Sequence, residues 1–246
     1  MTGQSPLTVR LLGEFSVEVA GRPLTGLAGD RPQSLLAYLL LHRSAPQSRR
    51  HVAYLLWPDS SEAQARSNLR NLFFTLRQAL PDPDRYLAAD TTTIQWRPDA
   101  PLALDVATFE HALAEADRLA QDPQAASERL EQAIALYRGD LLPGNYDDWL
   151  LALREEYRNR YVEALRRHAT LVEAGGDYPA AIRSAQRYLL ADPLNEPAYV
   201  QLMRLHALAG DRAAVQRLYQ QCVQVLRREL DVDPAPTTQQ AYHDLL

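Results

Sequence analysis

The sequence of 246 residues contains no lysine, a single cysteine and only 10 glycines. With one cysteine, an internal disulfide is excluded and a disulfide-stapled secreted domain is not expected. The low glycine content and 46% hydrophobic residues exclude a disordered chain. No apolar run approaches the roughly 20 residues that span a bilayer, and no basic-then-apolar leader opens the chain. We therefore expect a cytoplasmic protein with no membrane partner.

Because lysine is absent, the permanent positive charge is all guanidinium, which suits planar contacts with phosphate or guanine. A GC-rich genome also produces this absence. The net charge of −5 is unevenly spread: residues 1–100 hold eleven arginines and nine acids, and residues 101–246 hold fifteen and twenty-two. Between Arg31 and Arg77, seven arginines stand against two acids. This asymmetry favours an N-terminal polyanion binder and a C-terminal part with a different partner.

The first hundred residues have the order of strands, three helices and a hairpin. Alternating β-prone residues at 7–12 and 15–19 predict a small antiparallel sheet. Helices are expected at 31–41 with Asp30 as N-cap, at 49–57 with Ser48 as N-cap, and at 60–80. Residues 86–96 predict a hairpin with a polar tip at 90–93. This is the order of a winged helix, whose third helix enters the major groove and whose hairpin wing reaches phosphates or the minor groove.

The third expected helix has apolar residues on one face and amides, a hydroxyl and an aromatic ring on the other. Amides and arginines pair bidentately with base edges, and an apolar group can meet a thymine methyl. A helix whose second face packs on another part of the protein is the alternative, and Phe74 fits both interpretations. The residues predicted to read bases are Gln64, Ser67, Arg70, Asn71 and Phe74.

Contacts with DNA phosphates are expected from residues around this helix. Arg49 and Arg50 open the second helix, and a helix N-terminus with guanidinium groups favours phosphate; two solvated arginines are the alternative. Arg70 and Arg77 lie on one flank of the third helix, whereas Arg66 is placed closer to the core-facing side. The candidates on and after the wing, where a turn of threonines need have no function, are Thr91, Thr92, Thr93 and Arg97.

From residue 104 onward the pattern predicts helices only. They are expected at 105–119, 123–137 and 147–174, with Asp147 and Asp148 facing solvent. Gly176-Asp177 and Gly210-Asp211 stand 34 residues apart at helix junctions, which is the tetratricopeptide period. Such arrays bind proteins or peptides, or serve as scaffold. The expected fold is mainly α: an N-terminal winged helix-turn-helix (α+β) domain at 1–98, followed by an all-α tetratricopeptide-like domain at 102–246.

Catalytic chemistry has little support in the sequence. There is no glycine-rich phosphate loop with lysine, and the six histidines lack metal-ligand spacing. Cys222 falls in the apolar pattern of its helix and is expected in the core. We therefore expect no enzymatic activity, no catalytic residue, no metal site and no cofactor.

Short motifs stand in a fixed order along nearly the whole chain, among them Leu11-Leu-Gly-Glu-Phe15, Leu55-Leu-Trp-Pro-Asp59, Ala65-Arg-Ser-Asn-Leu-Arg70, Gly176-Asp-Tyr178, Asp192-Pro-Leu194 and Gly210-Asp-Arg212. In this order they resemble the SARP/AfsR-type transcriptional activators, in which an OmpR/PhoB-type winged helix precedes a bacterial transcriptional activator domain. Asp231-Val-Asp233 departs from the Leu-Gly-Val common in that family. The third helix also carries fewer arginines than in many relatives, so the operator sequence stays open.

The resemblance implies a one-component activator that binds repeated sites on double-stranded DNA as a homodimer or side-by-side pair. It implies contact with RNA polymerase, through the sigma factor or another subunit, base reading by the third helix, and a backbone contact by Arg77. The alternative function is a protein-interaction adaptor that uses the helical repeats. Larger family members continue into an ATPase, so the chain is either a small complete regulator or the N-terminal part of a larger signalling regulator. A deletion after about Ala100 is expected to keep DNA binding and lose activation.

Overall fold

The structure of the protein, a computed structural model, describes residues 6–246. Contacts divide the chain into two compact units. Unit 1 comprises Met1–Thr108 and Leu136–Tyr157, and unit 2 comprises Phe109–Ala135 and Arg158–Leu246. Unit 1 thus takes in a segment, 136–157, that the sequence did not associate with the winged helix. The domain limits at residues 98 and 102 stay a prediction.

Unit 1 opens with a four-stranded sheet, β1 (Leu7–Arg10), β2 (Ser16–Val19), β3 (Arg22–Pro23) and β7 (Leu102–Leu104). The strand order is β3-β2-β1-β7, with β1 antiparallel to β2 and parallel to β7. Leu7 and Val9 alternate with half-buried neighbours and are fully buried. The sheet was predicted, but β7 was not, because three residues are too few to show an alternation.

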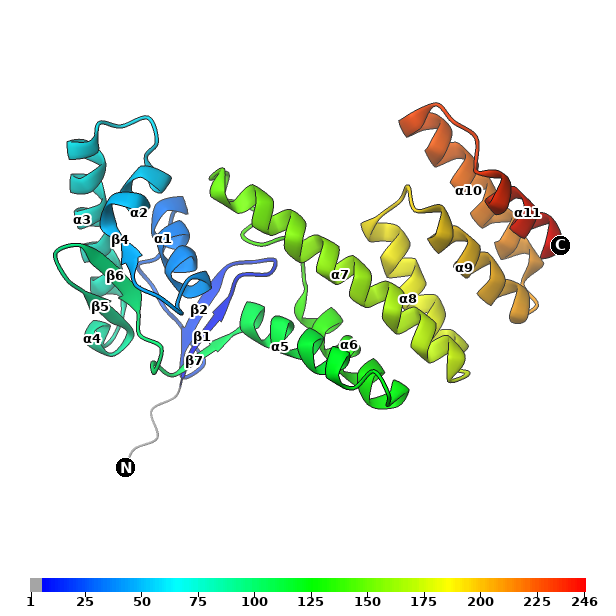
Figure 1. Ribbon diagram of the computed structural model, residues 1–246, viewed down its shortest axis with the longest axis horizontal. Helices are drawn as coiled ribbons and strands as arrows, with labels where there is room; N and C mark the ends of the chain where they lie inside the picture. Colours follow the sequence, from blue (N-terminus) through cyan, green and yellow to red (C-terminus); the bar gives the residue numbers. More distant parts are fainter. Residues whose placement is uncertain (1–5) are drawn as a thin grey trace. The chain divides into compact units, whose positions relative to one another are not determined.

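The winged helix is confirmed (Figure 1). Its helices are α1 (Asp30–Leu41), α2 (Arg49–Leu56), α3 (Glu62–Ala79) and the short α4 (Pro83–Tyr86). The wing is the hairpin of β5 (Leu87–Ala89) and β6 (Thr93–Trp96), and β4 (Gln47–Ser48) pairs with β6 on its other edge. Because β4 runs directly into α2, the pairing of Ser48 with Thr93 fixes the start of α2 beside the wing.

Two of the three helix starts follow from capping chemistry. The Ser48 hydroxyl accepts from the His51 N–H, at 3.4 Å, and the Ser61 hydroxyl accepts from the Gln64 N–H, at 3.3 Å, as expected for serine N-caps. The prediction for Asp30 was wrong: Gly29 is the N-cap of α1, at φ 94°. Glycine tolerates this positive φ, whereas aspartate would be strained there.

The junction of β7 and α5 is tied to the end of β1 by a half-buried carboxylate. Asp105 accepts from the backbone N–H groups of Leu11 and Leu12, each at 2.9 Å. Leu12 also forms an antiparallel bridge with Leu141. The contacts of Asp105 give acceptors to the backbone N–H groups of Leu11 and Leu12, where β1 has ended.

The start of the helix after residue 147 is tied to α1. Arg31 donates to Asp147 at 2.7 Å, and the Ser34 hydroxyl, fully buried, donates to the same carboxylate. Trp149 Nε1 donates to the Ser34 Oγ at 3.2 Å. The expectation that Asp147 faces solvent was therefore wrong, whereas Asp148 is exposed.

The remaining helices are α5 (Asp105–Arg118), α6 (Pro123–Leu136), α7 (Trp149–Ala174), α8 (Tyr178–Ala191), α9 (Glu196–Leu208), α10 (Arg212–Leu230) and α11 (Pro236–Asp244). Within unit 2, α8, α9 and α10 pack as successive hairpins (Figure 1). The predicted repeat is confirmed by its junctions. Gly176 and Gly210 have φ 82° and 76°. Asp177 and Asp211 cap the next helices through the N–H groups of Ala180 and Ala214, at 3.0 and 2.9 Å.

Cys222 lies in the core of unit 2, with no side-chain exposure, as predicted. Burial raises the pKa of its thiol to about 11. Across the described part of the chain, no helix combines the length and apolarity needed to cross a bilayer.

Candidate nucleic-acid interface

The face of α3 opposite the core presents the residues predicted to read bases. Gln64, Arg70, Asn71 and Phe74 are exposed, and Ser67 is half-buried. The other face packs through Leu69, Leu72, Phe73 and Leu76, which are buried. Phe74 is 62% exposed, which is unusual for a phenylalanine in water. The Gln64 amide donates to Asn68 Oδ1 at 2.8 Å, so one amide of this face is already engaged.

A depression of about 610 Å³ lies between the N-terminus of α2, one flank of α3 and the tip of the wing. It brings together five of the residues predicted from the sequence: Arg49, Arg50, Arg70, Thr91 and Thr92. Three charged residues that the sequence did not assign to it also line it: Glu62, Arg66 and Asp90. We call it the arginine depression, because four guanidinium groups border it against two carboxylates.

Arg49 connects α2 to the wing. Its backbone N–H donates to the Thr92 carbonyl and its Nε donates to the Asp90 carbonyl, both at 2.9 Å. The guanidinium carbon stands 5.3 Å from the centre of the Phe73 ring. Partial burial lowers the pKa of Arg49, Asp90 raises it, and Arg70 lowers it. The guanidinium stays charged, since an arginine is protonated under all ordinary conditions.

Asp90 organises the tip of the wing. Its carboxylate accepts from the backbone N–H groups of Thr92 and Thr93, each at 2.7 Å, and from both threonine hydroxyls. These bonds hold the pKa of Asp90 well below its usual range, the backbone donors contributing most. The hydroxyls of Thr92 and Thr93, predicted to contact phosphate, are therefore directed at a permanent negative charge, while Thr91 is exposed at the tip.

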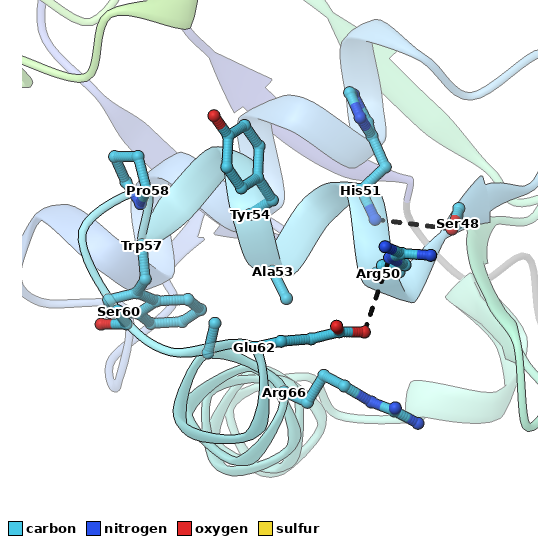
Figure 2. Close-up of a pocket in the computed structure, with 11 residues that line it drawn as sticks. Ser48, Arg50, His51, Ala53, Tyr54, Trp57, Pro58, Ser60, Glu62 and Arg66 are labelled. Carbon is cyan, nitrogen blue, oxygen red and sulfur yellow. Dashed lines mark hydrogen bonds and ion pairs between the residues drawn. The ribbon is translucent and has the colours of Figure 1, made fainter.

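Glu62 lies in the first turn of α3 and pairs with Arg50, with 3.5 Å between Glu62 Oε1 and Arg50 Nε. Figure 2 shows this pair and Arg66 at one end of a second depression, of about 410 Å³, whose other end holds Trp57 and Pro58. Arg66 is exposed, so its placement toward the core was wrong. The four-residue step from Arg66 to Arg70 puts both on one helix flank, a signal that was available in the sequence.

Arg77 and Arg97 do not line the arginine depression. Arg77 is half-buried and pairs with Asp84, at 2.8 Å. Arg97 is exposed just after β6, and its backbone N–H donates to the Tyr86 carbonyl at 2.7 Å. The structure thus separates the predicted phosphate contacts into a cluster beside α3 and two outlying arginines.

Comparison with known proteins matches residues 104–246 to the family model of the bacterial transcriptional activator domain. The regulatory protein AfsR of Streptomyces coelicolor is 27% identical over 224 residues, covering 89% of this chain and 22% of AfsR. The transcriptional regulatory protein MoaR1 of Mycobacterium tuberculosis is 26% identical over 254 residues, covering 96% of this chain and 78% of MoaR1. The chain therefore spans about a fifth of the length of AfsR.

Among solved structures, Mycobacterium tuberculosis EmbR in complex with a low-affinity phosphopeptide matches with a TM-score of 0.78 and 23% identity. The match covers 98% of this chain and 65% of the EmbR chain. The two chains therefore share a fold in which a winged helix precedes tetratricopeptide-like helices.

Proposed function

Because the chain belongs to the family of the bacterial transcriptional activator domain, the SARP/AfsR-type regulators, we propose that it binds specific DNA sequences and recruits RNA polymerase. In this proposal, α3 enters the major groove. The exposed side chains of Gln64, Arg70, Asn71 and Phe74 and the half-buried Ser67 face base edges, and the arginine depression receives backbone phosphate.

The observation that carries the proposal is the arginine depression beside the exposed amide face of α3. Base reading needs hydrogen-bond donors and acceptors on an exposed helix face that can enter the major groove. It also needs phosphate contacts that fix the position of this helix along the duplex. The flank with Arg66 and Arg70 adjoins the face with Asn71 on the same 18-residue helix. Arg49 and Arg50 supply charge from a second helix end.

Activation is assigned to the helical repeats of unit 2. The family supports a contact between these repeats and RNA polymerase, through the sigma factor or another subunit. It also supports a pair of protomers on repeated DNA sites. The predicted backbone contacts of Arg77 and Arg97 are part of the same proposal and extend the phosphate contacts beyond the depression. The contacts of Thr91 and Thr92 lie within it, and Thr93 follows them on the wing.

Binding of the full chain to a genomic library of duplex fragments tests the DNA-binding part. Each phosphate contact adds about 0.9 to the slope of log affinity against log salt. Four arginines predict a slope of roughly −4 and enrichment of a repeated motif in the bound fragments. Undetectable duplex binding at about 50 mM salt would remove the proposal.

A winged helix that docks protein is the second candidate. The 62% exposure of Phe74 favours it, because aromatic side chains are enriched at protein–protein interfaces. Binding of a protein partner with little salt dependence, in the absence of duplex binding, would support this candidate.

A further inference from the structure

The arginine depression contains two carboxylates where a phosphate-binding surface is expected to be uniformly positive. We propose that Glu62 is a built-in competitor for DNA phosphate. In the free protein its carboxylate holds Arg50, and DNA must displace it, which lowers the affinity for any duplex. This inference rests on the proposed DNA-binding function and adds a residue that restrains it.

Glu62 lies between two arginine side chains, one on α2 and one on its own helix, α3 (Figure 2). Its Oε1 is 3.5 Å from Arg50 Nε on α2, and Arg66 follows one turn later on α3 and lines the same depression. Figure 2 shows the Glu62 side chain extending toward Arg50, with Arg66 below it. The Arg50 and Glu62 side chains are 80% and 58% exposed, so both are accessible to DNA.

The two carboxylates of the depression differ in what holds them. Asp90 accepts four hydrogen bonds from Thr92 and Thr93 and so determines the shape of the wing tip. Glu62 is an exposed residue in the first turn of α3, where Ser61 supplies the N-cap. Glu62 can therefore be neutralised without disturbing the surface, whereas Asp90 cannot.

The expected size of the effect follows from exposure. An exposed ion pair is weak, and its loss changes an equilibrium by a few-fold. Removing a negative charge from the rim also removes its repulsion of the duplex backbone, an effect that salt screens over about 10 Å at 0.1 M. Glu62 thus lowers the affinity of the protein for the DNA phosphate backbone, whatever the base sequence. Stable binding then depends on the base contacts of α3.

The test compares binding of a random-sequence duplex by the full chain and by Glu62→Gln across a salt series. We expect the variant to bind about 3- to 10-fold more tightly at low salt, with a slope steeper by about one unit. The gain should disappear at high salt. Glu128→Gln is the matched control, because Glu128 is an exposed acid on α6 and the change in net charge is the same.

A double-mutant cycle assigns the effect to Arg50. In an Arg50→Gln background, Glu62→Gln should bring a smaller gain, because the competitor has lost the group that it holds. Thermal unfolding separates competition for Arg50 from a stabilising role of Glu62 in the first turn of α3. If Glu62→Gln only weakened the helix, it would lower Tm without making the dependence of affinity on salt steeper.

Three outcomes would overturn the inference: no change for Glu62→Gln, an equal gain for Glu128→Gln, or weaker binding of selected fragments by Glu62→Gln. The last would mean that Glu62 accepts a hydrogen bond from cytosine. These outcomes presuppose that the wild-type chain binds duplex. If it does not, the proposed function fails first, so the two failures are distinguishable.

Discussion

Asn71 and Arg49 have different chemical roles in the proposed interface. Asn71 is an exposed amide on α3, whereas Arg49 is a guanidinium at the rim of the arginine depression. We expect Asn71→Ala to cost about 1–3 kcal/mol against the preferred sequence only, and Arg49→Gln to weaken all sequences alike. Competition between a selected fragment and random duplex measures both. If both variants lost the preference for the selected fragment equally, the assignment of Asn71 to base reading and of Arg49 to phosphate contact would be contradicted.

We expect His168 to make the stability of unit 2 depend on pH. It is buried, and its Nδ1 lies 2.7 Å from the Ser184 hydroxyl. Burial lowers the pKa of His168, against the opposing charges of Glu131 and Asp177. The unfolded chain, whose histidine keeps the ordinary pKa of about 6.5, then binds the proton more readily. Stability is therefore lost as pH falls from about 7 toward the folded-state pKa.

We expect the free energy of unfolding of the wild type to fall between pH 8 and pH 5 by more than that of His168→Gln. Glutamine keeps a hydrogen-bonding group near Ser184 but does not titrate. Urea titrations at the two pH values measure the difference. A parallel pH dependence in both proteins would show that other groups are responsible.

Single residues differ in how far the sequence could predict them. The exposure of Asn71 and Phe74 follows from the 3.6-residue period of one helix, and the burial of Cys222 follows in the same way. The pairing of Arg50 with Glu62, or of Arg49 with the Asp90 carbonyl, depends on how α2, α3 and the wing meet. No periodicity within one element contains that information.

Among the elements, α1 depends on a segment more than one hundred residues later. Asp147 accepts from Arg31 and from the buried Ser34 hydroxyl, which also accepts from Trp149. We expect Asp147→Ala to lower the free energy of unfolding by about 1–3 kcal/mol, because Ser34 and Arg31 lose their acceptor. Asp148→Ala, at an exposed neighbouring position, should change it by less than about 0.5 kcal/mol. Equal effects in denaturant titrations would contradict the role of Asp147.

The difference between local patterns and long-range contacts also explains which elements the sequence could predict. Long amphipathic helices and the serine-capped starts of α2 and α3 are local properties and were predicted to within a few residues. β7 and the contacts of Asp147 were missed, because a three-residue parallel strand and a single carboxylate have no local signature. Gly13 in the Leu11-Leu-Gly-Glu-Phe15 motif has a similar long-range cause. Its φ is 92°, and a Cβ there would lie 3.2 Å from Arg138.

For the whole molecule, these contacts alter what a truncated chain is expected to do. A chain that ends at Ala100 keeps α3 and the wing but loses β7, Asp105 and residues 136–157, which belong to the same compact unit. The backbone N–H groups of Leu11 and Leu12 then have no carboxylate acceptor, and each unpaired buried group costs about 1–3 kcal/mol. The earlier expectation that this deletion keeps DNA binding should therefore be reversed.

We expect the 1–100 fragment to unfold without a cooperative transition, or to bind duplex at least 10-fold more weakly than the full chain. Circular dichroism melting and the salt-series binding assay measure the two effects. The full-length chain with Asp105→Ala is the control, because it lacks the carboxylate that accepts from Leu11 and Leu12 but keeps residues 136–157. Its stability and its affinity for duplex should lie between those of the fragment and of the full chain. If the fragment melted cooperatively and bound duplex like the full chain, residues 136–157 would not be needed for the stability of the winged helix. If it does not, residues 104–246, which match the bacterial transcriptional activator domain, contribute to the stability of the winged helix. The two proposed functions then cannot be separated by cutting the chain between them.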